Sequence, residues 1–361
     1  MTSVKNRCQI SRHGTNAVRG LPRSPADLLR AVLAPLALLW SCQLAAQMLP
    51  ITVSVPGPGA ASYLPVSLIS RIGADRAEGA QVRVQYVSGG GVAIQELLSN
   101  NVEFAVLGLP AAMSARLKDS RIVALAAVND LPLYVLLVRA GLKGKVRSVA
   151  DLKHRVIGVH SNSITTKTNS HQLIELLLRQ AGVAPEQVRF VSVGQRWSSE
   201  ASMLAAGSAD AIMGDEPHAA RMVAEQTAFQ LVHLGNPEAA AAIPGGGFLR
   251  GVLVGRRDRI DQDPKKAETM VRILRRTLAW IASHSAEEVV AMAGIEDPQE
   301  RRYMLATLRN YPRQYSIDGR FSSRQLQDTE VFFRQSQATN SAAQALRVES
   351  MILDRWVGRK E

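Results

Sequence analysis

Hydroxyl and amide side chains are concentrated in one short segment, 161–166, which reads Ser-Asn-Ser-Ile-Thr-Thr. The segment follows the strand-like run Arg155–His160 and precedes a helical pattern that ends at Gly182. Such side chains cap helix N-termini, and with the unpaired N–H groups of the helix they can also replace the water shell of an anion or polar group. We therefore predict ligand binding here, with capping as the alternative reading. The candidate residues are Ser161, Asn162, Ser163, Thr165 and Thr166.

Small residues form a second group of candidates, because they follow other strand-like runs. Glycines at such positions allow a ligand to approach the backbone closely. The alternative reading is a tight turn that only needs a positive φ. The candidates are Ala61, Ser62, Gly89, Gly90 and Gly108.

Trp197 and Glu216 are the remaining candidates, each placed after a strand-like run. Trp197, beside Arg196, offers an aromatic wall and a cation for a carboxylate or sulfonate, although a lone Trp more often packs in a core. Tyr63 has a similar position and a similar alternative. Glu216 accepts from an ammonium or amidine group, or else caps a helix that starts at Pro217.

Catalytic and cofactor motifs are missing from the sequence. The seven histidines show no HExxH spacing, and the two cysteines, Cys8 and Cys42, lie close to the N-terminus. There is no GxSxG, Walker A or dinucleotide fingerprint. The sequence therefore predicts no catalytic residues, metal or cofactor.

Strand-like runs rich in β-branched residues alternate with helical patterns from Ile51 onward, which predicts an α/β protein with largely parallel strands. In such folds ligands bind beyond the carboxyl ends of the strands, where the candidates above lie. The predicted strands are Ile51–Val55, Gln81–Val87, Phe104–Gly108, Arg121–Val128, Leu133–Ala140, Arg155–His160, Val188–Gly194, Asp210–Gly214 and Phe248–Gly255.

Two long apolar runs, Leu133–Ala140 and Phe248–Gly255, are predicted to cross between two lobes, with the hinge near 133–138 and 251–255. Lobe 1 is expected to comprise 48–137 and 248–361, with lobe 2, 138–247, inserted between them. After Pro264 only helical patterns occur, among them a long one over 265–291 and a last one over 341–356. We expect these helices to form a C-terminal extension packed on lobe 1.

The first 47 residues have the layout of a secretory signal peptide. A basic stretch precedes the uncharged run Ala31–Ala46, which contains Pro35 and is shorter than the roughly 20 residues that a spanning helix needs. An alternative reading places a lipoprotein processing box before Cys42, which would anchor the chain by a lipid. The formal net charge is +12, but no Lys/Arg block accompanies it, so nucleic-acid binding is not predicted.

Several segments in order resemble one family of exported proteins, the solute-binding proteins of ABC importers of the nitrate/sulfonate/taurine group, which includes thiamine-precursor binders. His154 stands where this family usually has Gly, and Gly214-Asp215 alters the approach to Glu216-Pro217. The segments are VQYVSGGGVAIQELLSNNVEFAVLG, VRSVADLKHRVIGVHSNSITTKT, QLIELLLRQAGVAPEQVRFVSVG, MLAAGSADAIMGDEPHAARM and YSIDGRFSSRQLQDTEVFF.

The resemblance implies a two-lobed periplasmic-binding-protein type II fold and a monomeric protein of the periplasm. It also implies capture of a small polar or anionic organic ligand and delivery to an ABC permease and ATPase complex. Three alternatives stay open: a receptor of a tripartite (TRAP/TAXI-type) secondary transporter, an exported ligand sensor, and a cytosolic biosynthetic enzyme of the thiamine-precursor kind. Neighbouring genes would distinguish the two transporter readings, and the signal segment argues against the enzyme.

Overall fold

The computed structural model describes residues 48–163 and 166–361, which include the compact unit Met48–Glu361 apart from its two undescribed positions. The expected signal peptide, Cys42 and Thr165 lie outside the described residues. Within the described part, no helix combines the length and the hydrophobicity needed to cross a membrane.

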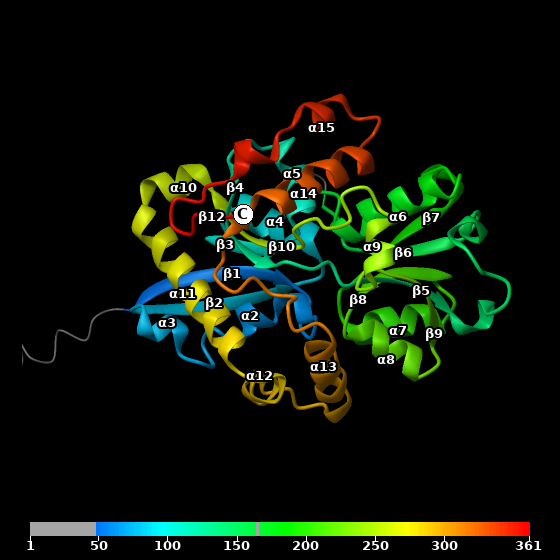
Figure 1. The fold of residues 1–361 in the computed structure, drawn as a ribbon, viewed down its shortest axis with the longest axis horizontal. Coiled ribbons are helices and arrows are strands. Elements are labelled where there is room, and N and C mark those ends of the chain that lie inside the picture. The colour runs from blue at the N-terminus through cyan, green and yellow to red at the C-terminus, as the bar shows by residue number, and fades with distance from the viewer. Residues whose placement is uncertain (1–47, 164–165) are drawn as a thin grey trace, which may run out of the picture. The chain divides into compact units, whose positions relative to one another are not determined.

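The first sheet has the strand order β2-β1-β3-β10-β4, drawn in blue, cyan and yellow-green in Figure 1. β1 is parallel to β2 and β3, whereas β10 is antiparallel to β3 and β4. The late strand β10 therefore returns to the sheet that the chain built first. The strands are β1 Leu49–Pro56, β2 Ala80–Val87, β3 Phe104–Leu107, β4 Ile122–Asn129 and β10 Gly251–Arg256.

The second sheet has the order β7-β6-β8-β5-β9, with β6 parallel to β7 and β8 and β5 antiparallel to β8 and β9. We call the part of the chain built on the first sheet lobe 1 and the part built on this sheet lobe 2. The exact boundaries expected at 137/138 and 247/248 stay predictions. The strands are β5 Tyr134–Arg139, β6 Val156–His160, β7 Arg189–Val193, β8 Ala211–Asp215 and β9 Ala228–His233.

Helices follow most strands, as expected for α/β topology. The chain also forms short 3-10 helices, which are η1 Ala61–Tyr63, η2 Ala140–Leu142, η3 Val149–Leu152, η4 Pro185–Gln187 and η5 Val348–Met351. In lobe 1 the helices are α2 Leu64–Leu68, α3 Ala74–Ala77, α4 Gly90–Leu98 and α5 Leu109–Arg116. In lobe 2 they are α6 Asn169–Gln180, α7 Trp197–Ala205, α8 His218–Ala224 and α9 Pro237–Ala241.

The C-terminal part is helical, but less uniformly than predicted. The expected helix 265–291 is two helices, because Ser285 caps a new one through Glu288. The expected helix 341–356 ends at Ala345, and a two-residue parallel pair of strands, β11 and β12, was not predicted. The elements are α10 Arg257–Gln262, α11 Pro264–Ser283, α12 Ala286–Ala293, α13 Pro298–Asn310, β11 Phe321–Ser322, α14 Ser323–Ser336, α15 Ser341–Ala345 and β12 Arg359–Lys360.

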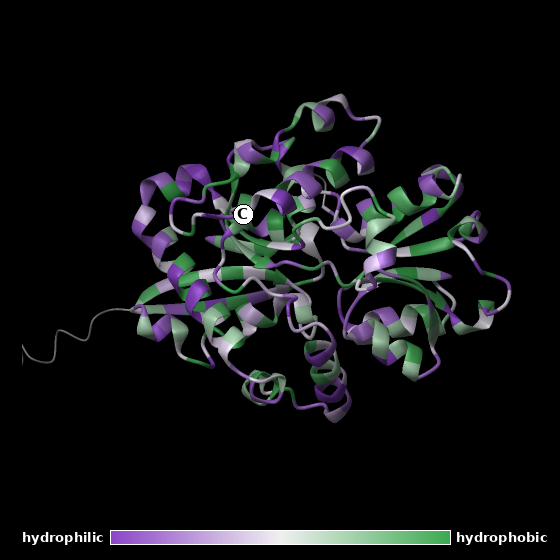
Figure 2. Ribbon diagram, viewed as in Figure 1, coloured by the Kyte–Doolittle hydropathy of each residue, from purple (hydrophilic) through white to green (hydrophobic). Residues whose placement is uncertain are grey.

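Each lobe has its own hydrophobic core, and the apolar colouring of the strands in Figure 2 marks their positions. The lobe 1 core includes tail residues such as Leu278, Val289, Met304 and Phe333, so the C-terminal helices pack on lobe 1 as expected, while Phe332 of α14 also enters a lobe 2 cluster. Lobe 2 buries apolar side chains in two separate clusters that share the strands of its sheet, for example Leu136 in one and Leu137 in the other. The two rigid sheets position the loops described next.

Candidate ligand-binding site

A small cavity lies where the strand ends of both lobes meet. Lobe 1 contributes the residues after β1, β2 and β3 and the one before β10, while lobe 2 contributes the starts of β5 and α6 and the ends of β6 and β7. A molecule in this cavity would contact both lobes. The lining residues are Tyr63, Gly90, Gly108, Ala111, Tyr134, His160, Thr168, Asn169, Gln195 and Arg250.

Three helix N-termini converge on the cavity. α4 begins at the lining residue Gly90, α5 begins directly after Gly108, and α6 begins at Asn169. The first N–H groups of a helix have no partner within the helix, and the helix dipole makes this end positive. The cavity therefore favours a negatively charged group.

Arg250 adds a full positive charge to this cavity. Its side chain is 1% exposed, and its Nη2 donates to Asp215 Oδ2 at 2.6 Å. The guanidinium also lies 4.4 Å from the ring centre of Tyr134 and 5.7 Å from that of Tyr63. Burial alone would lower the pKa of Arg250, but the charge of Asp215 together with Tyr134 and Tyr63 outweighs this and raises it, so the guanidinium stays charged.

Two atoms of this buried pair have no hydrogen-bond partner among the described residues. They are Nε of Arg250 and Oδ1 of Asp215, while Asp215 Oδ2 also accepts from Gln195 Nε2 at 2.7 Å. Native proteins satisfy nearly all buried polar atoms. An unpaired donor on a cavity-lining arginine therefore indicates a position for a ligand atom.

Of the predicted small residues, Gly90 and Gly108 line the cavity. Gly89 lies where the backbones of the lobes touch, because a Cβ there would be 2.6 Å from Ser161 O and 2.7 Å from Ser161 N. Ala61 also joins the lobes, since its N–H donates to Glu216 O at 3.3 Å. Ser62 is buried beside it and does not line the cavity.

The predicted polar segment lies near the cavity, but its described side chains bond among themselves and to neighbouring loops. Asn162 Oδ1 accepts from Thr168 N at 2.8 Å, directly before α6 begins at Asn169. Ser161 Oγ accepts from Ser192 Oγ at 2.9 Å, and Ser163 Oγ accepts from Thr166 N at 3.1 Å. None of these residues is part of the cavity lining, and neither is the buried Thr166.

Trp197 and Glu216 likewise do not line the cavity, and their side chains contact other residues of the protein. Trp197 begins α7 and carries the guanidinium of Arg221 3.6 Å above its ring. Glu216 Oε2 accepts from Ala220 N at 3.1 Å, and Oε1 lies 3.0 Å from His233 Nε2. Glu216 therefore caps the start of α8, its alternative reading.

Sequence reasoning missed most of the polar lining. Arg250 had a visible signal, because it is the one charge in the apolar run FLRGVLVG, 248–255. A charge in a buried strand needs a partner or a function. The other missed residues, Ala111, Tyr134, His160, Thr168, Asn169 and Gln195, gave no such signal, because only the fold brings them together.

Residues 76–288, more than half of the chain, match the family model described as "NMT1/THI5 like". The chain belongs to this family. The family and the fold were both expected from the resemblance above. No curated protein matches the sequence.

Solved structures share the fold of this family member at low sequence identity. A protein of Bordetella bronchiseptica RB50 is 19% identical with a TM-score of 0.75, covering 85% of this chain and 95% of that one. The alkanesulfonate-binding protein SsuA of Xanthomonas axonopodis, bound to MOPS, is 13% identical with a TM-score of 0.66, covering 86% and 100%. The periplasmic nitrate-binding protein NrtA of Synechocystis is 12% identical with a TM-score of 0.62, covering 85% and 86%. The desulfurization enzyme DszB also has this fold, with 15% identity, a TM-score of 0.51, and coverage of 85% and 97%.

Proposed function

We propose that this protein is an exported solute-binding protein that captures a small organic anion between its lobes. The observation that carries the proposal is the buried Arg250, whose Nε lacks a partner beside three helix N-termini. A guanidinium offers several donors in a fixed plane, which matches a carboxylate or sulfonate group. The neighbours named for sulfonate and nitrate binding support an anion as ligand.

Lobe closure is the mechanism that this site supports. Arg250 and the N-termini of α4 and α5 belong to lobe 1, while Asp215 and the N-terminus of α6 belong to lobe 2. A ligand that bridges them binds the closed form better than the open one, so it shifts the population toward closure. The closed form would then deliver the ligand to the permease and ATPase of an ABC importer.

The proposal extends to location and to the fate of the ligand. We expect a monomer in the periplasm, and a ligand that is recovered unchanged from the protein. One fold neighbour is an enzyme, so the ligand released from the denatured protein should be examined by NMR. A chemically altered ligand would contradict the proposal.

A thermal-shift experiment tests the ligand class on residues 48–361. Ethanesulfonate, taurine, nitrate and benzoate are compared with the uncharged ethyl methyl sulfone and with the cation choline. Ligand at about 100 times its Kd stabilises the folded state by about 2.7 kcal/mol, which raises the Tm of a chain of this size by several degrees. We expect a shift with at least one anion and none with the neutral or cationic compounds. A shift with choline and none with any anion would overturn the proposal.

A further inference from the structure

A second buried polar cluster adjoins the ligand cavity, and the proposed function does not use it. His160, at the end of β6, lines the cavity, and its Nε2 lies 3.0 Å from Glu200 Oε1. The other oxygen of Glu200, Oε2, lies 3.5 Å from His218 Nδ1. The three side chains are 3%, 0% and 3% exposed. We call these residues the His160–Glu200–His218 cluster.

The cluster is incompletely hydrogen-bonded. Glu200 Oε2 and His218 Nδ1 are both without a hydrogen-bond partner among the described residues, although they face each other. A buried carboxylate oxygen without a partner is costly. A proton shared between these atoms would remove that cost.

His218 also faces lobe 1, so the charges around its side chain would change when the lobes open or close. It begins α8, and the charged groups around it are Glu200 from α7, Asp215 from β8 and Glu300 from α13. A Cβ at Gly59, in the loop after β1, would lie 3.3 Å from His218 Nε2 and 2.7 Å from Glu300 Oε1. Opening the lobes would take His218 away from Glu300 and into water.

The same two helices are joined by an ion pair, which places the α8–α13 contact between the lobes. Arg221 Nη1, one turn after His218, donates to Asp297 Oδ2 at 2.8 Å, at the start of α13. Closure therefore brings α13, with its carboxylates, against α8.

The helix N-termini favour an anion, but the side-chain charges of the buried site oppose one unless a proton is added. Arg250 carries one positive charge, and Asp215 and Glu200 carry two negative ones. Burial favours the neutral acid, but His160 and His218 outweigh this and hold the pKa of Glu200 below its ordinary value, so it stays a carboxylate. With both imidazoles neutral the site has a net negative charge, which would repel an anionic ligand in a low-dielectric interior.

We propose that the site binds its anion together with one proton, held by the His160–Glu200–His218 cluster. This inference rests on the proposed function. His160 contacts the ligand, and Glu200 and His218 are positioning residues that take up the proton from solvent and retain it. The added proton makes the buried site neutral before the anion enters.

The charges around His218 support this inference and determine whether closure is favoured at low or at high pH. Burial alone would lower the pKa of His218, but Glu200, then Asp215 and Glu300, outweigh it and raise the pKa. Glu300 contributes only when the lobes are closed, so closure raises the pKa further. The closed form is therefore favoured at low pH and loses this contribution as the pH rises through the pKa of His218.

The first test needs no ligand. Residues 48–361 contain no cysteine, so Ala224→Cys on α8 and Ala291→Cys on α12 allow two spin labels to report the distance between lobes. We expect the distance to increase between about pH 5 and about pH 9, the range in which histidines titrate. Glu300→Gln should flatten this dependence, whereas the matched Glu296→Gln, an exposed neighbour, should preserve it. A distance that does not change with pH would overturn the inference.

The second test uses ethanesulfonate and calorimetry in phosphate and Tris buffers, whose ionisation enthalpies differ. We expect uptake of up to one proton per ligand bound, with affinity falling up to about tenfold per pH unit at high pH. Glu200→Gln removes the charge that needs the proton, so this variant should bind without proton uptake and with little pH dependence. Binding to the unmodified protein without proton uptake would overturn the inference. If ethanesulfonate fails to bind, the sulfonate ligand is wrong and the spin-label experiment alone decides the inference.

Discussion

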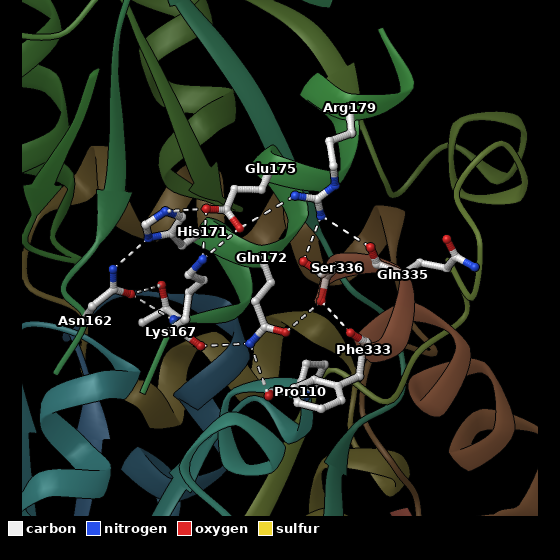
Figure 3. A network of polar contacts seen from close by, with 11 residues as sticks. Pro110, Asn162, Lys167, His171, Gln172, Glu175, Arg179, Phe333, Gln335 and Ser336 are labelled. Carbon is white, nitrogen blue, oxygen red and sulfur yellow. Dashed lines mark hydrogen bonds and ion pairs between the residues drawn. The ribbon is translucent and has the colours of Figure 1, made fainter. Parts of the chain in front are cut away.

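The two lobes meet in two regions that differ in how completely their polar atoms are paired. One region joins α6 of lobe 2 to α5 and α14 of lobe 1 (Figure 3), and we call it the α6–α14 junction. There Gln172 Nε2 donates to Pro110 O at 3.1 Å and to Lys167 O at 2.8 Å. Its Oε1 accepts from Ser336 Oγ at 3.1 Å, so both ends of this buried amide are satisfied.

Charges at the α6–α14 junction are paired just as fully. Glu175 lies 2.8 Å from Lys167 Nζ and 3.2 Å from His171 Nε2. Arg179, one turn later, donates through Nη2 to Ser336 O at 2.7 Å. Figure 3 shows these side chains as one continuous network between α6 and α14.

The cavity region has the opposite character. Its buried atoms without partners among the described residues include Arg250 Nε, Asp215 Oδ1, Glu200 Oε2 and His218 Nδ1. A satisfied network holds two elements together, whereas unsatisfied buried atoms cost stability unless something else pairs with them. We infer that the α6–α14 junction keeps the lobes attached and that the cavity region is reserved for the ligand.

The segments that cross between the lobes run beside the α6–α14 junction. Thr329 Oγ1 of α14 accepts from Leu249 N at 2.9 Å, and Gln325 Nε2 donates to Asp130 O at 3.0 Å. Both crossings are thus bonded to α14. The hinge position stays a prediction, and these bonds favour the loops before β5 and before β10 over the strands themselves.

Among the predicted variants of the two regions, the replacement of Arg250 should have the largest effect on ligand binding and on stability. Arg250→Met removes the charge that pairs with the ligand, and we expect at least about 30-fold weaker binding of ethanesulfonate, in line with 2–5 kcal/mol for a buried charge pair. It also leaves Asp215 buried without a countercharge, which should lower the free energy of unfolding by about 3–5 kcal/mol. Calorimetry and urea denaturation measure the two effects.

The double variant Arg250→Met/Asp215→Asn separates binding from stability. Removing both charges should recover much of the lost stability but none of the binding. Recovery of binding in the double variant would show that Arg250 acts only by neutralising Asp215.

The sequence was sufficient for the fold because alternation of strand and helix patterns is a local signal. β9, which is AFQLVH at 228–233 and only half buried, was not predicted. The strand-end rule located Gly90 and Gly108 but could not separate capping from binding at Glu216, because one side chain type does both. Arg250 was overlooked because it stood within an apparent strand, and its partner Asp215 lies far away in sequence.

Closure itself can be blocked at a single glycine. Gly89 has an extended φ of 176°, which any residue adopts, so Gly89→Ala should fold normally. Its new Cβ would meet the Ser161 backbone at 2.6 Å only when the lobes are closed. We expect a longer distance between the spin labels at positions 224 and 291 and about tenfold weaker ligand binding, while the free energy of unfolding changes by less than about 1 kcal/mol.

Gly90→Ala is the matched control for this variant. The nearest atom to a Cβ at Gly90 is Leu107 Cβ, at 3.7 Å, which is ordinary van der Waals contact. The label distance of Gly90→Ala should equal that of the unmodified protein. An unchanged distance in Gly89→Ala as well would mean that the lobes close without the contact at Ser161.

The smallest effect is expected at the α6–α14 junction, and it should appear in stability alone. Burial raises the pKa of Glu175, but hydrogen bonds from His171 and Lys167 outweigh burial and lower the pKa. The stability that the Glu175 carboxylate contributes is therefore present above about pH 4.3, the ordinary pKa of Glu. This stability is lost as the pH falls through the folded-state pKa. Glu175→Gln should therefore lower the free energy of unfolding at neutral pH by about 1–3 kcal/mol and flatten its decline in acid, as measured by urea denaturation at several pH values. The label distance and its pH dependence should not change, because Glu175 belongs to the region that keeps the lobes attached. A variant with altered closure but unaltered stability would reverse the roles assigned to the two regions.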